Sequence, residues 1–117
     1  MNPMRTAPDQ VSTAELFSRL AATIKDRRNA DPERSYVAKL CGGGTEAIAK
    51  KVGEEAVETV LAAVSEDRNA LLRESADLVF HLMVLWAHSD IALDDVAAEL
   101  ARRERVSGLE EKRGRRN

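Results

Sequence analysis

Apolar side chains recur along this chain with the spacing of α-helices, at about 3.6 residues per turn. The first such stretch begins at Ser12, whose hydroxyl can cap a helix while Glu15, three residues on, completes a capping box. Its apolar positions share one face of a helix: Leu16, Phe17, Leu20, Ala21 and Ile24. The stretch ends near Asn29, before Asp31-Pro32 interrupts the pattern. We therefore expect a first helix over residues 12–29.

Three more helices are predicted downstream, over about residues 45–65, 68–88 and 93–105. Residues 35–40 form too short a segment to assign to an element, and Gly42-Gly43-Gly44 predicts a turn after it. No segment alternates with period two for long enough to predict a strand. The predicted fold is therefore all-α, a bundle of about four helices with short connections.

The two ends of the chain lack this helical period. Residues 1–11 contain Pro3 and Pro8 and are expected to form a flexible extension. Residues 107–117 are polar and rich in arginine and glycine, and are expected to fray. The helical domain is predicted to span residues 12–106, as one domain, because two cores in 117 residues would each be marginal.

Composition excludes several classes of function. With 44% hydrophobic and 32% charged residues the chain is typical of a soluble globular protein. Aromatic residues make up 3% of it and the net charge is −2, so no nucleic-acid partner is expected. No stretch approaches the roughly 18 apolar residues of a membrane span, and no secretory signal is evident. The lone Cys41 is consistent with a reduced, cytoplasmic setting.

Acidic residues form the candidate chemistry on the second and third predicted helices. On the second, the wheel groups Lys51, Glu55, Glu58 and Ala62 outside an apolar arc made of Ile48, Val52, Ala56, Val60, Ala63 and Val64. Glu55 and Glu58 alone would be an ordinary solvated surface. The third helix is apolar in nearly every direction between residues 76 and 87, and is therefore predicted to be buried on most sides.

Four polar residues interrupt that buried helix on one side, within about 60° of one another on the helical wheel: Glu74, Asp77, His81 and His88. Glu74 and Asp77 are therefore expected to face inward or into a cleft. Buried carboxylates need basic partners or cations, and oxygen ligands suit Mg²⁺. Magnesium would neutralise a polyphosphate and polarise the attacked phosphorus.

Two further residues are candidates for contact with a substrate. Lys51 lies one turn before Glu55 and is placed to pair with a carboxylate or a phosphate oxygen, although a solvated lysine is an equal alternative. His81 follows Asp77 by one turn and is placed to bond a ligand carboxylate or approach the substrate. The alternative for His81 is a hydrogen-bonded histidine of the core.

These residues also carry a family resemblance. Glu54-Glu55-Ala-Val-Glu58 followed by Glu74-Ser-Ala-Asp77 is similar to the EExxE…ExxD signature of the MazG-like, all-α nucleoside triphosphate pyrophosphatases. Within that group the chain resembles the phosphoribosyl-ATP pyrophosphohydrolase (HisE) family from about Leu16 to Lys112. Five blocks in order carry the resemblance: Ser35-Tyr36-Val-Ala-Lys-Leu40, Ile48-Ala-Lys-Lys51-Val-Gly53-Glu-Glu-Ala-Val-Glu58, Glu74-Ser-Ala-Asp77-Leu-Val-Phe-His81, Leu93-Asp94-Asp95-Val96 and Ser107-Gly108-Leu-Glu110-Glu111-Lys112.

The resemblance implies hydrolysis of phosphoribosyl-ATP to phosphoribosyl-AMP and pyrophosphate, the second step of histidine biosynthesis. It implies that the metal ligands and catalytic residues are Glu55, Glu58, Glu74 and Asp77, with Glu54 as a neighbour. Together with Lys51 and His81, which the helical spacing places beside these acids, Glu54 is predicted to bind the substrate. In this hypothesis the four acids hold at least one Mg²⁺, and a metal-associated water attacks the triphosphate. Which carboxylate takes the proton is left open.

A homodimer is predicted because the third helix has more apolar surface than the other helices can cover. The resemblance also implies a dimer, which would complete the bundle. One cysteine and two histidines cannot supply the zinc site of a fused cyclohydrolase, so a separate cyclohydrolase is expected to act next. Two alternatives remain open, a house-cleaning nucleoside triphosphate pyrophosphatase and a non-catalytic helical dimerisation module.

Overall fold

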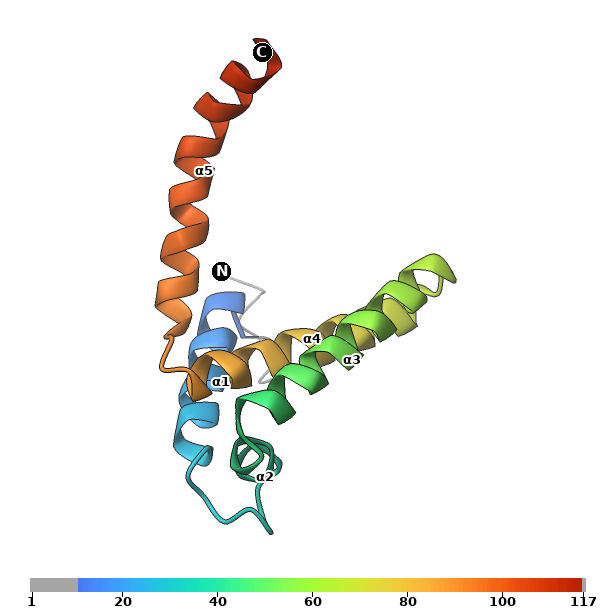
Figure 1. Ribbon diagram of the computed structural model, residues 1–117, viewed down its shortest axis with the longest axis vertical. Helices are drawn as coiled ribbons and strands as arrows, with labels where there is room; N and C mark the ends of the chain where they lie inside the picture. The colour runs from blue at the N-terminus through green and yellow to red at the C-terminus, as the bar shows by residue number, and fades with distance from the viewer. Residues whose placement is uncertain (1–10, 117) are drawn as a thin grey trace, which may run out of the picture.

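Five α-helices make up the described part of the chain, which in this computed structural model is residues 11–116, with side chains described for residues 11–106. In chain order they are α1 (Thr13–Arg27), α2 (Tyr36–Gly42), α3 (Gly44–Val64), α4 (Arg68–His88) and α5 (Leu93–Arg116) (Figure 1). No strand occurs within that range, which confirms the all-α prediction. The predicted extension, residues 1–11, lies outside the described residues except for Val11.

Side-chain caps fix where three of the helices begin. At α1 the predicted capping box is present, because Glu15 N–H donates to Ser12 Oγ at 3.0 Å and Ser12 N–H donates to Glu15 Oε1 at 3.2 Å. Asp67 caps α4 by accepting from Ala70 N–H at 3.0 Å. Ser35 caps α2 in the same way, at 3.1 Å from Ala38 N–H. The caps satisfy backbone donors that have no partner within their own helix.

Helix α2 is an element that the sequence left unassigned. Seven residues are too few for a helix that is stable by itself, so its stability comes from packing. Val37 and Ala38 are buried, and Val37 belongs to the hydrophobic core. The predicted glycine turn separates α2 from α3. Gly44 has φ +81°, and a Cβ at Gly43 would lie 2.7 Å from Ala47 Cβ, so both positions require glycine.

Helices α3 and α4 form an antiparallel hairpin that projects from the rest of the molecule (Figure 1). The connection is short, and Glu66 within it has a positive φ of 58°. Thr59 ties the two helices together, because its hydroxyl lies 2.8 Å from the carbonyl oxygen of Glu55 on its own helix and 3.2 Å from that of Glu74 on α4. The hairpin therefore sets Glu55 and Glu74 side by side.

The face of α3 that packs on α4 differs from the predicted apolar arc. Its buried residues are Ile48, Glu55 and Ala62, which recur every seven residues along one side. Val60 and Val64 of the predicted arc are 59% and 74% exposed. Ile48 is therefore the buried member of the apolar arc, whereas Val60 and Val64 lie on a different side of α3 from Ile48, Glu55 and Ala62.

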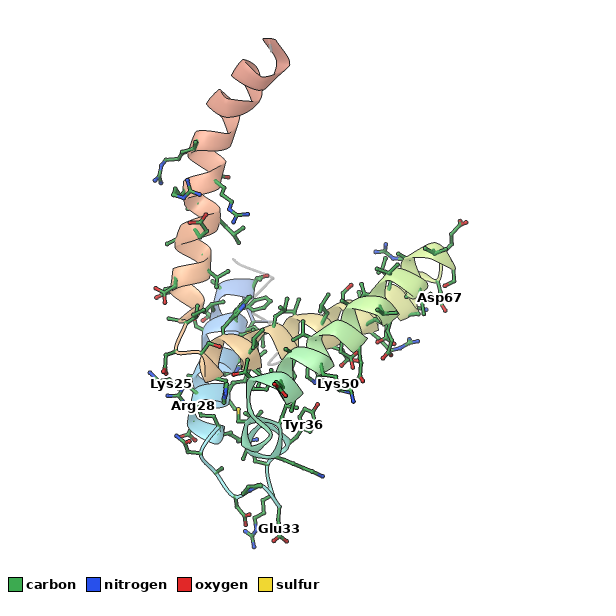
Figure 2. All side chains as sticks on the ribbon, viewed as in Figure 1. Lys25, Arg28, Glu33, Tyr36, Lys50 and Asp67 are labelled. Atoms are coloured by element: carbon green, nitrogen blue, oxygen red, sulfur yellow. The ribbon has the colours of Figure 1, made fainter. Side chains whose placement is uncertain are left out.

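The core lies where α1, α2, α3 and α4 meet, at the base of the hairpin. Its buried members are Ile24, Val37, Ile48, Met83 and Val84. Arg28, labelled in Figure 2 near the end of α1, fastens this base by donating to the carbonyl of Ala87 and pairing with Asp90 at 3.2 Å. Arg28 therefore links the end of α1 to the end of α4 at the base of the hairpin.

Helix α5 runs further than the sequence predicted and points away from the body (Figure 1). The predicted end of this helix near residue 105 was wrong, since the backbone stays helical to Arg116. Gly108 and Gly114 lower helix stability by only about 1 kcal/mol each, and the glutamates, lysine and arginines around them favour a helix. Among the described residues no single helix is long and apolar enough to cross a bilayer, although α4 and the first part of α5 reach the threshold when taken together across a 110° bend.

Candidate functional site

Three carboxylates converge on one side of the hairpin. Glu55 and Glu58 come from α3 and Glu74 from α4, and each offers an oxygen within 4.8 Å of the others. Spacing of three residues puts Glu55 and Glu58 on the same side of α3. The Thr59 bridge to the carbonyl of Glu74 sets the register that brings the third acid beside them. We call these three residues the carboxylate cluster.

Glu55 is the buried member of the carboxylate cluster, with 6% of its surface exposed. Its Oε2 lies 3.4 Å from the ammonium of Lys51, but its Oε1 is buried with no hydrogen-bond partner among the described residues. Burying a carboxylate oxygen without a partner is costly. Such an oxygen fits a cation ligand, and a set of carboxylate oxygens without nitrogen or sulfur fits a hard cation such as Mg²⁺.

The cluster holds more negative charge than its surroundings balance. Loss of solvent contact raises the pKa of Glu74, and the charges of Glu58, Asp77 and Glu55 raise it further. The same surroundings favour the charged form of Lys51, because the Glu55 carboxylate beside it raises the pKa of the ammonium. One lysine beside several carboxylates leaves the site attractive to a further cation or to a proton.

Two predicted site residues lie at the edge of the cluster. Asp77 is exposed and is not among the three acids whose oxygens lie within 4.8 Å of one another, although its charge acts on Glu74. Of the two expectations for Asp77, inward or into a cleft, the first was wrong, because the buried residues of α4 begin one turn later, at His81. Glu54 has a half-exposed side chain, 3.8 Å from the Lys51 ammonium.

His81 is buried and both of its ring nitrogens have partners within the chain. Nδ1 lies 2.7 Å from the carbonyl oxygen of Asp77, and Nε2 lies 2.8 Å from the hydroxyl of Tyr36. The ring is thus a hydrogen-bonded histidine of the core, which was one of the two interpretations of the sequence. It bears on the site through Tyr36.

Tyr36 is a residue of the site that sequence reasoning did not single out. Its ring stacks on Phe80, with centroids 6.4 Å apart, and meets the ring of His81 edge-on. Burial raises the pKa of the Tyr36 phenol, the positive charge of Lys51 lowers it, and the negative charges of Glu55 and Asp77 raise it. The signal available in the sequence was its place in the Ser35–Leu40 block.

In the single chain Glu58 is exposed and Glu74 is partly exposed, whereas Glu55 is buried. Two cavities of about 390 and 460 Å³ are lined by residues around Arg28, and no member of the carboxylate cluster lines either one. Glu58 and Glu74 therefore form the part of the cluster that solvent reaches in the single chain.

Comparison with known proteins gives a consistent result. The chain matches the family described as phosphoribosyl-ATP pyrophosphohydrolase over residues 17–104. Three relatives, each named phosphoribosyl-ATP pyrophosphatase, illustrate the similarity. The one from Novosphingobium aromaticivorans is 55% identical over 103 residues, covering 88% of this chain and 96% of the relative. Those from Azospirillum brasilense and Caulobacter sp. (strain K31) are 53% and 56% identical, covering 95% and 86% of this chain and 99% and 94% of the relatives.

Proposed function

The chain belongs to the phosphoribosyl-ATP pyrophosphohydrolase family, and from this we propose that it hydrolyses phosphoribosyl-ATP to phosphoribosyl-AMP and pyrophosphate at the carboxylate cluster. The protein is then a cytoplasmic enzyme of histidine biosynthesis, acting on the second step, and a separate cyclohydrolase takes its product. The relatives named phosphoribosyl-ATP pyrophosphatase are 50–56% identical to this chain. This similarity favours phosphoribosyl-ATP as the substrate over the damaged nucleotides of a house-cleaning enzyme. No nucleic-acid or membrane partner is proposed.

The observation that carries the assignment of the site is the buried, unpartnered Oε1 of Glu55 beside two further carboxylates. We infer that Glu55, Glu58 and Glu74 hold Mg²⁺, with Asp77 as a further ligand at the edge. When bound, magnesium neutralises the polyphosphate, polarises the attacked phosphorus and lowers the pKa of a nearby water. The same acids are the catalytic residues of this proposal.

Lys51 provides positive charge on the same side of α3. Its ammonium has three donors, and its distances of 3.4 and 3.8 Å to Glu55 and Glu54 are long for hydrogen bonds to carboxylates. The side chain is more than a third exposed and is free to turn toward a phosphate oxygen. Lys51 therefore holds the triphosphate against the cluster, and Glu54 keeps the lysine oriented when substrate is absent.

A homodimer completes the site in this proposal. The outward side of α3 carries four exposed apolar residues, Val57, Val60, Leu61 and Val64. Leu72 of α4 is a fifth exposed apolar residue of the hairpin. We call these five residues the outer apolar face. Such a face on an open hairpin is typical of a surface that packs against a second copy.

Pyrophosphate release tests the proposal directly. Phosphoribosyl-ATP is compared with ATP, dUTP and dCTP, each with magnesium and with excess EDTA. Fast, magnesium-dependent release from phosphoribosyl-ATP alone is expected. Release only from the ordinary nucleotides would move the protein to the house-cleaning class, and no release from any of the four would leave the dimerisation module.

A further inference from the structure

The hydrogen bond between His81 and Asp77 determines which atom donates in the hydrogen bond between His81 and Tyr36. The carbonyl oxygen of Asp77 is an acceptor only, so His81 Nδ1 must carry the proton that joins them at 2.7 Å. In the neutral ring Nε2 then has a lone pair and accepts. The Tyr36 hydroxyl, 2.8 Å away, is therefore the donor.

This direction determines what the phenolic oxygen of Tyr36 can still bind. Its proton is committed to His81, and its lone pairs remain available. The ring is held by stacking on Phe80 and by its edge-on contact with His81, so the oxygen has a fixed position. The residue is nevertheless 49% exposed, which leaves it open to a ligand. Tyr36, labelled in Figure 2, thus presents a hydrogen-bond acceptor at a set place beside His81, whose ring bonds the carbonyl oxygen of Asp77 at the edge of the cluster.

An acceptor selects a ligand group that donates. The oxygens of a polyphosphate carry no proton to donate near neutral pH, so they do not suit Tyr36. The ribose that bears the triphosphate is joined to the α-phosphate through one carbon, and its two hydroxyls are donors. It is the next group along the substrate once the triphosphate lies on the cluster.

We propose that Tyr36 is a substrate-binding residue that accepts a hydrogen bond from a hydroxyl of the ribose carrying the triphosphate, and that His81 is the positioning residue that holds the Tyr36 oxygen in this role. The inference rests on the proposed function, because it takes the triphosphate to lie on the carboxylate cluster. It assigns to α2, the short helix that the sequence left unassigned, a part in choosing the substrate.

The test pairs the variant Tyr36→Phe with substrates that lack one hydroxyl. Phosphoribosyl-ATP and its 2′-deoxy and 3′-deoxy analogues, modified on the triphosphate-bearing ribose, are each assayed for kcat/KM with both proteins. With the parent substrate Tyr36→Phe is expected to lower kcat/KM by about 3- to 10-fold, the effect of one neutral hydrogen bond. With one of the two deoxy analogues the two proteins should agree within about twofold, because the partner hydroxyl is already absent.

An equal fall in kcat/KM of the Tyr36→Phe variant with all three substrates would overturn the inference. The effect of the Tyr36 hydroxyl would then not depend on a hydroxyl of the ribose. Failure of the wild-type protein to hydrolyse phosphoribosyl-ATP would instead overturn the proposed function, and would be seen before any variant is compared. Ser65→Ala is the matched control. It removes a hydroxyl that bonds the carbonyl of Ala62 at the far end of α3, and should leave all three values unchanged.

His81 is tested by whether an acceptor at its position restores discrimination. His81→Leu removes the acceptor, and should reduce the preference for the parent substrate over the sensitive deoxy analogue to that of Tyr36→Phe. His81→Gln keeps a side-chain oxygen there and should recover part of that preference. Circular dichroism and melting temperature establish that both variants fold. A folded His81→Leu variant with the full wild-type preference would show that His81 does not position Tyr36.

Discussion

At the scale of single residues, the buried carboxylate of Glu55 lowers the stability of the fold but suits the binding of a cation. A carboxylate that is 6% exposed, with one oxygen unpartnered, weakens the fold of the isolated chain. Lys51 offsets part of that cost through a contact of 3.4 Å. A glutamate is advantageous there when a cation completes its coordination, which is the reason we place it at the centre of the site.

Glu55→Gln should therefore separate activity from stability. The amide keeps the shape of the side chain without its charge, so kcat/KM should fall by more than about 100-fold, beyond the loss of an outer-sphere partner. In EDTA the variant should melt no lower than the wild type. Addition of Mg²⁺ should raise the melting temperature of the wild type alone. Glu104→Gln, which changes an exposed acid on α5, is the control. Wild-type activity of the Glu55 variant would contradict the site.

Glu58→Ala and Asp77→Ala test the exposed part of the site. Each should abolish turnover while the helical signal in circular dichroism stays unchanged, because both side chains are exposed in the single chain. Pyrophosphate release measures the first effect. If both variants kept their activity, the four-acid assignment would be wrong.

At the scale of elements, the α3–α4 hairpin is what turns three separate acids into a cluster. Thr59 contributes by a hydroxyl that contacts the carbonyl oxygens of Glu55 and Glu74 at 2.8 and 3.2 Å. This side chain links the two helices next to the site. Its loss should therefore affect the pairing of the helices more than the secondary structure of either one.

Thr59→Val keeps the shape of the side chain and removes that hydroxyl. We expect the free energy of unfolding to fall by about 1 kcal/mol, the value of one hydrogen bond. Urea denaturation measures the change. Thr45→Val, at an exposed position at the start of α3, is the control and should change it little. A Thr59 variant as stable as the wild type would show that the bridge does not hold the hairpin.

Helix α5 carries its own stabilising charges. Glu99 pairs with Arg102 at 2.6 Å and with Arg103 at 2.9 Å, and hydrogen bonds from both lower the pKa of Glu99 to about 2. A lowered pKa means that the stabilisation is present above the ordinary value of about 4.5 and is lost as the pH falls toward 2. These groups are exposed, so salt should weaken the effect.

The contribution of the Glu99 ion pairs to the helix is measurable by amide exchange or by NMR shifts of residues 99–103. Glu99→Gln should lower the helicity of this segment at pH 7 in low salt. The difference from the wild type should shrink in high salt and between pH 4.5 and pH 2. A difference that was constant across this pH range would show that the ion pairs do not support the helix.

At the scale of the whole molecule, the single chain is too open to be a complete globule. Its radius of gyration is 17.5 Å, against about 13 to 14 Å for a compact domain of this length. The hairpin and α5 extend in different directions from a small base (Figure 1). The outer apolar face lies along the hairpin, where a second copy can cover it.

Val60→Glu should break the proposed homodimer. The residue is 59% exposed, so the single chain tolerates the change, but the charge would be buried between subunits. Losing about 1.5 kcal/mol from each subunit weakens association by about 100-fold or more. Sedimentation velocity measures the state, and Lys39→Glu, exposed on α2, is the control. A wild-type chain that is monomeric at micromolar concentration would contradict the dimer.

The sequence determined what depends on neighbours along the chain. The capping box at Ser12, the glycine turn before α3 and the existence of the long helices all follow from interactions within a few residues. Helical spacing likewise put Glu55 and Glu58 on one side of α3, and the motif they share with Glu74 marked the family.

The tertiary structure decided what depends on segments far apart. Packing of Val37 and Ala38 makes α2 a helix, although seven residues alone would not hold one. Packing against the other helices buries the side of α3 that carries Ile48, Glu55 and Ala62, and leaves Val60 and Val64 exposed. The bond between Tyr36 and His81 spans 45 positions in the chain, so no local pattern reports it. Local periodicity gives the faces of a helix, but only the neighbouring helices determine which face is buried.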